Sequence, residues 1–210
     1  TGPLVMTSAN PSGLPILADD DEMAAYFDRR AEIAGLLSHN RPIVRRLDDS
    51  VAAVALGGPV MRRRSRGYAP LSIPAPGAVL GGPTLLAVGA QEKNAPCLFR
   101  RGLFYPAAEV GDLDGVEMEA AFRQSVDDLC GLLGGPVQAV ACDLHPDYPT
   151  TRYARSLGLP VFAVQHHHAH IASVMAEHRL TDPVIGVALD GTGYGADGAA
   201  WGGEFLVVAP

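Results

Sequence analysis

A cluster of histidines is the strongest chemical feature of this sequence. Four of its seven histidines lie within five residues, at His166, His167, His168 and His170. The apolar residues that follow recur at helical spacing and predict a helix over 164–177. On a helix, His166 and His170 share one face one turn apart, which suits two imidazole ligands of one metal ion. His167 with His170 is the alternative pair and is less well aligned.

A carboxylate completes this candidate metal site. Asp190 ends the apolar run at 184–189 and precedes a glycine turn, so we expect it at the end of a strand. Two imidazoles and one carboxylate are a ligand set typical of iron or zinc. The alternative is that these histidines only pack, cap the helix or face solvent. Four clustered histidines together with Asp190 favour the metal site.

A glycine-dense turn follows Asp190 and joins two expected strands. Glycine lets a backbone approach a phosphate closely, so this turn is a candidate nucleotide contact. It is neither a Rossmann fingerprint nor a Walker A motif. Lys93, in an earlier hairpin turn, is a candidate catalytic residue facing the same ligand, and an ordinary surface lysine is the alternative. The candidate nucleotide-binding residues of the turn are Gly191, Thr192, Gly193 and Gly195.

Asp143 and His145 follow another predicted strand, at 137–141. The carboxyl ends of strands are where α/β sheets tend to place their ligands. Both residues are therefore candidate catalytic groups, with His145 as a base or a further metal ligand. A purely structural hydrogen bond between the aspartate and the histidine explains the pair equally well.

The first third of the chain carries a second set of polar residues. Thr7, Ser8 and Asn10 follow a predicted strand at 3–7, and such a turn presents small polar groups to a phosphate or is simply a polar turn. Four arginines lie in the five residues 62–66. In a strand, Arg62, Arg64 and Arg66 would share a face that binds phosphates or RNA, or would form a solvated basic edge. The candidate nucleotide-binding residues of this segment are Arg64, Ser65 and Arg66.

Composition restricts the class of protein. Hydrophobic residues make up 48% of the 210 residues and charged residues 19%, which is typical of a chain with a packed core. The net charge of -7 argues against a general nucleic-acid binder. No apolar run reaches the ~18 residues that span a bilayer, so no membrane association is expected. The three cysteines form no C-x-x-C pair, which favours the reducing cytoplasm.

Helical and strand patterns alternate along the chain, which predicts an α/β fold. A Pro/Gly-rich linker at 73–83 separates a first unit at 1–72 from a second unit at 84–210. The chain begins without methionine and ends in a strand-like run, so we expect an internal fragment of a larger protein. The other predicted helices lie at 22–37, 117–133 and 150–157, and the other strands at 42–45, 50–55, 60–63, 85–88, 96–99, 161–164 and 204–208.

Seven blocks together resemble a known family. TSANPSG, HNRPIVRRLDDSV and RRRSRGYAP resemble the carboxyl-terminal part of a YrdC-like carbamoyl-adenylate-forming domain. GAQEKNAPCL, CDLHPDYPTT, VQHHHAHIASVMAEH and LDGTGYGADGAAWGGEF resemble the amino-terminal half of a metal-bearing carbamoyl-transfer domain. Their order in one chain is similar to that of the HypF family of hydrogenase-maturation carbamoyltransferases. The resemblance implies a partial YrdC-like α/β domain followed by the first half of an actin/Hsp70/sugar-kinase-like α/β domain.

The resemblance also implies a reaction. Members of the family use carbamoyl phosphate and ATP with Mg²⁺ to make carbamoyl adenylate, and pass the carbamoyl group to a carboxyl-terminal cysteine of the partner HypE. Ser8, Asn10, Ser65 and Arg66 then belong to the first nucleotide site. The resemblance further implies affinity of the YrdC-like part for double-stranded RNA, and zinc fingers only upstream of this chain. The family's S-Q-H-I-G-D-L stretch reads AAEVGDL at 107–113.

Two other functions are compatible with similar domains. The enzymes that make threonylcarbamoyladenosine in tRNA contain related domains, and activity with threonine in place of carbamoyl phosphate would identify them. A non-catalytic fragment that binds a nucleotide, a metal or RNA is the third hypothesis. The order of the seven blocks in one chain favours the hydrogenase-maturation family.

Overall fold

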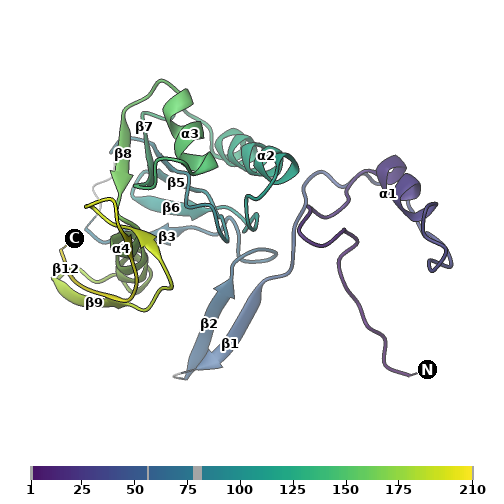
Figure 1. The fold of residues 1–210 in the computed structure, drawn as a ribbon, viewed down its shortest axis with the longest axis horizontal. Helices are drawn as coiled ribbons and strands as arrows, with labels where there is room; N and C mark the ends of the chain where they lie inside the picture. The colour runs from purple at the N-terminus through teal and green to yellow at the C-terminus, as the bar shows by residue number, and fades with distance from the viewer. Residues whose placement is uncertain (1, 56, 78–81, 210) are drawn as a thin grey trace.

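The computed structural model describes residues 2–55, 57–77 and 82–209. Figure 1 shows a loosely organised amino-terminal segment, a projecting hairpin and a packed body that contains the rest of the chain. The predicted linker at 73–83 includes residues 78–81, which lie outside the described residues. None of the described helices is both long and apolar enough to cross a membrane.

The amino-terminal segment contains one helix, α1 (Asp20–Phe27). Asp19 caps it by accepting hydrogen bonds from two backbone N–H groups of its first turn. The predicted helix over 22–37 is wrong beyond Phe27. Since α1 fully buries none of its residues, tertiary packing does little to sustain further turns.

Two strands predicted in this segment do not form. Residues 3–7 and 42–45 have no regular secondary structure, and Leu4, Val5 and Met6 are almost fully exposed. A β-branched, apolar run becomes a strand only when a neighbouring strand completes its hydrogen bonds. No described residue supplies such a neighbour for either run.

The projecting hairpin confirms the next two predicted strands. β1 (Val51–Ala55) pairs antiparallel with β2 (Gly58–Arg63). The chain then passes from β2 toward the packed body (Figure 1). Ser65, two residues after β2, is buried. β2 ends at Arg63, so the alternation expected for Arg62, Arg64 and Arg66 does not continue beyond that residue.

A six-stranded sheet forms the centre of the packed body, in the order β3-β6-β5-β4-β7-β8. β4, β7 and β8 are parallel, and β5 runs antiparallel to both of its neighbours. The strands are β3 (Ile73–Pro74), β4 (Leu85–Ala87), β5 (Cys97–Arg100), β6 (Leu103–Pro106), β7 (Ala139–Asp143) and β8 (Val161–Val164). β6 was not predicted, and β3 lies at the start of the predicted linker.

Two helices cover this sheet. α2 (Val116–Leu133) buries Met118, Phe122, Val126 and Leu129, which is the apolar face that its helical spacing predicted. α3 (Pro149–Ser156) begins with a proline in its first turn and packs beside β7. The ring of Phe122 meets the ring of Tyr153 edge to face at 5.1 Å, which joins the two helices.

The carboxyl-terminal part forms a smaller layer. α4 (His166–His178) packs on the antiparallel pair of β9 (Val184–Ala188) and β12 (Glu204–Val208) through Ile171 and Met175. A short hairpin of β10 (Gly193–Tyr194) and β11 (Ala200–Trp201) lies between these strands in the sequence. The predicted α/β class is confirmed.

Candidate metal and nucleotide site

The pairing of β7 with β8 places two distant segments side by side. The strands are parallel, and Asp143 lies opposite Val164 at their carboxyl ends. Gln165 then caps α4, its side-chain oxygen accepting a hydrogen bond from the His168 N–H at 2.9 Å. The first turn of the histidine helix therefore starts next to Asp143.

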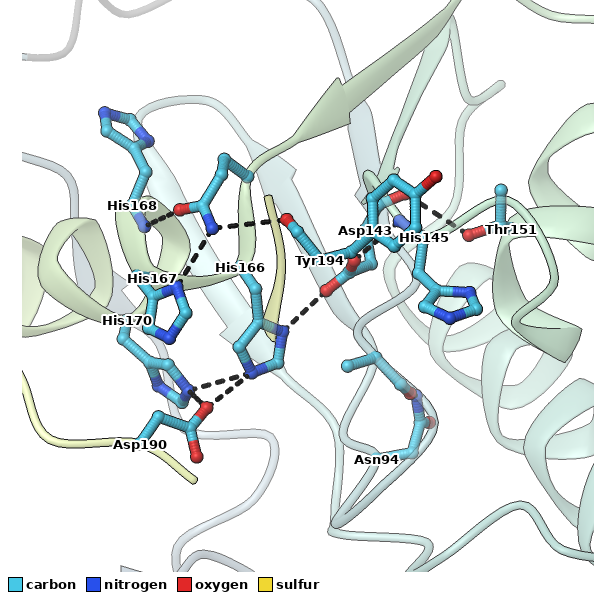
Figure 2. A network of polar contacts seen from close by, with 12 residues as sticks. Asn94, Asp143, His145, Thr151, His166, His167, His168, His170, Asp190 and Tyr194 are labelled. Atoms are coloured by element: carbon cyan, nitrogen blue, oxygen red, sulfur yellow. Dashed lines mark hydrogen bonds and ion pairs between the residues drawn. The ribbon is translucent and has the colours of Figure 1, made fainter. Parts of the chain in front are cut away.

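Three predicted metal ligands come together at this point (Figure 2). His166 Nε2 lies 2.9 Å from Asp190 Oδ2, and His170 Nε2 lies 3.4 Å from the same oxygen. The two Nε2 atoms are 3.2 Å apart. One ligand atom from each residue falls within 4.8 Å of the others, so one ion could contact all three.

His167 takes no part in this cluster. Its side chain is fully buried, and its Nδ1 contacts the Gln165 amide at 2.9 Å. The alternative pairing of His167 with His170 is therefore wrong. A helix turns 100° per residue, and the residue that follows His166 consequently faces the interior.

Asp143 contacts His166 at Nδ1, the ring nitrogen opposite the one that lies near Asp190 and His170. Its Oδ2 lies 2.7 Å from His166 Nδ1, and its Oδ1 accepts a hydrogen bond from the His145 N–H at 2.8 Å. The hydrogen bond that Asp143 accepts from His166 raises the pKa of His166, although burial opposes the shift. Burial also works against the charged form of Asp190, but the Gly191 N–H and the two imidazoles outweigh it and lower the pKa of Asp190.

His145 lies beside the cluster but is not one of its three ligands. Its Nδ1 accepts a hydrogen bond from the Asp147 N–H at 3.2 Å, and its ring stacks on Tyr148 at 4.1 Å. Tyr194 meets the same imidazole edge to face at 5.0 Å. The side-chain hydrogen bond of Asp143 runs to His166, and His145 contributes only its backbone N–H.

Close packing requires glycine at two positions of the glycine turn. A Cβ on Gly193 would collide with His166 and His167, and one on Gly195 would collide with the indole of Trp201. The indole N–H donates to Asp197 at 3.0 Å and closes the hairpin. Gly191 and Thr192 are exposed, so they are the members of the turn that are open to a ligand.

Lys93 lies in a turn with a left-handed backbone, at a φ of 46°. Its N–H donates to Asp112 Oδ1 at 2.8 Å, and its side chain is exposed. The neighbouring Asn94 is buried and donates to the carbonyl oxygens of Val88 and Ala90. The buried Asn94 side chain therefore holds the turn in place, while the exposed Lys93 side chain extends into solvent, where it can reach a ligand.

The polar side chains of the first segment form hydrogen bonds and ion pairs with other residues of the protein. The Ser8 hydroxyl donates to Asn10 Oδ1 at 2.6 Å, the Asn10 amide donates to the Leu14 carbonyl at 2.8 Å, and Thr7 is exposed. Arg64 pairs with Glu177 at 3.9 Å and Arg66 with Asp49 at 3.3 Å. The two arginines therefore contact separate carboxylates and do not converge on one point.

Sequence reasoning gave no specific role to Ser50, which it placed at the start of the strand predicted at 50–55. Its hydroxyl accepts a hydrogen bond from the buried Ser65 N–H and donates to the Arg66 carbonyl, both at 2.9 Å. A serine beside a strand carries no distinctive pattern, so only the tertiary contact reveals this role.

Three family models match the chain. The HypF Kae1-like domain covers residues 81–177, and the second subdomain of the carbamoyltransferase Kae1-like domain covers 186–210. The Sua5/YciO/YrdC model, described as telomere recombination, covers 1–65. Carbamoyltransferase HypF of Rhizobium leguminosarum bv. viciae is 44% identical and carbamoyltransferase HypF2 of Cupriavidus necator 45% identical, each over 98% of this chain.

The chain belongs to the HypF family. A crystal structure of full-length HypF in the phosphate- and nucleotide-bound form matches 97% of the chain with a TM-score of 0.90 at 41% identity. A HypF structure from T. kodakarensis matches 97% with a TM-score of 0.86 at 39% identity. The chain covers 32% and 26% of those structures, and it spans about a quarter (26%) of these two curated relatives.

Proposed function

We propose that this protein is an ATP-dependent carbamoyltransferase of [NiFe]-hydrogenase maturation. It uses carbamoyl phosphate, forms carbamoyl adenylate, and transfers the carbamoyl group to the carboxyl-terminal cysteine of a HypE-type acceptor. The observation that carries this proposal is the meeting of His166, His170 and Asp190 beside an open glycine turn. Relatives named carbamoyltransferase, at 44% and 45% identity, support the same reaction.

The reaction divides naturally into two steps. Before these steps, water hydrolyses carbamoyl phosphate to carbamate and phosphate. Carbamate is a poor electrophile, so in the first step, which depends on ATP, its oxygen attacks the α-phosphorus of ATP and pyrophosphate leaves. The acceptor thiolate then attacks the carbamoyl carbon, and AMP leaves with the bonding electron pair. We assign the first step to the segment at 1–72 and the second to 84–210, joined through 73–83. This protein therefore needs two nucleotide sites in one chain.

In the first site, we propose that Thr7, Ser8 and Asn10 face the nucleotide from one side. Arg64, Ser65 and Arg66 would complete the site, with Mg²⁺ accompanying ATP, once the two arginines exchange their separate carboxylate partners for phosphates. Ser50 supports this second group through its hydrogen bonds to the backbone of Ser65 and Arg66. Guanidinium groups suit phosphates because they donate in a planar, forked geometry.

In the second site, His166, His170 and Asp190 would hold a divalent iron or zinc ion. Such an ion neutralises nucleotide phosphates or polarises the carbamoyl oxygen when it is bound. The donor set fits, because both Nε2 atoms and one carboxylate oxygen face a common point. In our proposal Gly191 and Thr192 line the nucleotide side of this site, and Gly193 and Gly195 let the turn pack close to the rings beside it.

Three further residues have proposed roles around the transferred group. The Lys93 ammonium, on its fixed turn, would bind the anionic oxygens of the carbamoyl adenylate. His145, whose Nδ1 accepts from a backbone N–H, presents Nε2 as a proton donor to the departing nucleotide. Asp143 orients His166 through the hydrogen bond that it accepts from Nδ1. We expect the whole reaction to take place in the cytoplasm.

The test compares two histidine variants in the complete gene product. His166→Ala/His170→Ala removes two proposed ligands, whereas His168→Ala removes an exposed histidine of the same helix as a matched control. With ATP, carbamoyl phosphate and the acceptor, the double variant is expected to lose bound metal and acceptor carbamoylation but keep pyrophosphate release. Unchanged metal content and carbamoylation in the double variant would refute the site.

A further arm separates the related enzyme class. Threonine with bicarbonate and ATP replaces carbamoyl phosphate, and formation of threonylcarbamoyl adenylate is measured. We expect none. Its formation, without carbamoylation of the acceptor, would assign the protein to tRNA modification.

A further inference from the structure

We propose that Asp143 is a positioning residue for the metal ligand His166. It acts by fixing which imidazole nitrogen carries the proton and which one faces the metal. This inference rests on the proposed function, because it concerns the same site. It goes further by giving a specific role to a carboxylate that is not one of the three ligands.

The contact between Asp143 and His166 is short and enclosed. Asp143 Oδ2 lies 2.7 Å from His166 Nδ1, and the two side chains are only 5% and 16% exposed. A buried carboxylate is costly unless both of its oxygens are satisfied. Here the second oxygen accepts the His145 N–H at 2.8 Å, so the carboxylate is held at both ends.

The position of the proton follows from the chemistry of the pair. An ionised carboxylate can only accept hydrogen bonds, so His166 must donate to it from Nδ1. A neutral imidazole with its proton on Nδ1 has its lone pair on Nε2. That atom is the one that lies 2.9 Å from Asp190 and 3.2 Å from His170 Nε2. The buried carboxylate therefore selects the tautomer that can bind a metal.

The two histidine ligands differ in burial and in the hydrogen bonding of their rings. His166 is mostly enclosed and anchored through Nδ1, whereas the His170 side chain is 56% exposed. Asp143 itself is placed by a rigid element, since it ends β7, whose partner β8 leads directly into α4. Carboxylates behind histidine ligands commonly orient the ring and raise its basicity. We infer that His166 is the preorganised ligand of the site.

The decisive variant is Asp143→Asn. The one amide oxygen can still accept the His145 N–H, which turns the NH₂ group toward His166 Nδ1. That arrangement favours the proton on Nε2 and blocks metal binding there, as exchanging a carboxylate for an amide does behind other functional histidines. Asp147→Asn is the matched control, because Asp147 lies in the same turn with an exposed side chain.

The measurement is Zn²⁺ affinity of the complete gene product, by competition with a chromophoric chelator. We expect Asp143→Asn to lower the affinity by roughly 10- to 100-fold and Asp147→Asn to leave it unchanged. In a His166→Ala background, Asp143→Asn should have no further effect, because its action passes through the missing ring. Additive losses in this double-variant cycle would overturn the positioning role.

A second measurement needs no variant of Asp143. A two-bond ¹H–¹⁵N spectrum of metal-free protein labelled at histidine, at mildly alkaline pH, reports the tautomer of His166. His166→Ala identifies its signals. A proton on Nδ1 supports the proposal, and a proton on Nε2 overturns it even if Asp143→Asn does not fold.

The outcomes also distinguish this inference from the proposed function. If the wild-type protein binds Zn²⁺ and Asp143→Asn binds it equally well, only the positioning role fails. If the wild-type protein binds no metal, the site in the proposed function fails together with it.

Discussion

Gly193 lies directly against His166. A Cβ at Gly193 would fall 2.9 Å from the Cβ of His166 and 2.6 Å from Cε1 of His167. The glycine turn therefore packs directly against the histidine side chains of α4. Asp190 immediately precedes this turn, so a shift of the turn would also move Asp190 relative to the histidines.

We predict that Gly193→Ala weakens both folding and metal binding. The added methyl group must push the turn away from α4, which costs about 1–3 kcal/mol of unfolding free energy and separates Asp190 from His166. Urea unfolding and Zn²⁺ affinity measure the two effects. Gly191→Ala is the control, since a Cβ there meets nothing within 4 Å and its φ is not left-handed. Equal stability of the two variants would contradict the prediction.

Stabilisation by metal should increase with pH. Without metal, the raised pKa of His166 stabilises the fold below the ordinary value of 6.5, and this contribution is lost as the pH rises through the raised value. Metal competes with that proton, so binding strengthens over the same range. The rise in melting temperature on adding Zn²⁺ should therefore be larger at pH ~8.5 than at pH ~5.5.

Asp190 affects the pH dependence of stability only at acidic pH. Its lowered pKa stabilises the fold above the ordinary value of 3.8, and that contribution is lost only as the pH falls through the lowered value. The predicted pH dependence near neutrality is therefore that of His166. A rise in melting temperature that does not change with pH would contradict proton competition at His166.

Lys93→Gly should separate stability from activity. The left-handed backbone at Lys93 is strained for any residue with a Cβ and relaxed for glycine. After allowing for the greater freedom of glycine in the unfolded chain, stability should be unchanged or higher by up to about 1 kcal/mol. Carbamoyl transfer should be lost with the ammonium group.

The control for Lys93→Gly is Glu92→Gly, at an exposed neighbour whose φ is not left-handed. It should lower stability by roughly 0.5–1 kcal/mol and leave transfer intact. Urea unfolding and acceptor carbamoylation measure both variants. Full transfer activity in Lys93→Gly would remove the lysine from the proposed mechanism.

Ser50→Ala should affect the first reaction step alone. Without the hydroxyl, the buried Ser65 N–H loses its acceptor and the Arg66 carbonyl loses its donor, at a cost of about 1–3 kcal/mol. We expect slower pyrophosphate release from ATP and carbamoyl phosphate, with normal Zn²⁺ affinity. Ser156→Ala, which removes a hydroxyl bonded within α3, is the control. A parallel fall in Zn²⁺ affinity would show that the damage is not local.

Local patterns determined much of the packed body. The apolar spacing of α2, the β4–β5 hairpin and the shared face of His166 and His170 all follow from residues near one another in the chain. Such periodicities are fixed by backbone geometry and need no knowledge of distant partners. The α/β class and the family resemblance also came from the sequence.

The amino-terminal segment shows where local patterns fail. Residues 3–7 and 42–45 have the composition of strands, yet they remain irregular, and the helix predicted over 22–37 ends at Phe27. Strands and short helices gain most of their stability from packing against other elements. Whether such a partner is present is a tertiary property that composition does not encode.

The organisation of the site itself was decided by tertiary structure. Asp143 and His145 are close in sequence, but the side chain of Asp143 bonds to His166, which the β7–β8 pairing brings beside it. Gly193 and Gly195 suggested a phosphate turn, and the fold shows that each also makes room for a packed ring. The sequence by itself specified which residue types could bind a metal. Only the parallel pairing of two strands specified which of them touch, because hydrogen bonds depend on positions in space and not on spacing along the chain.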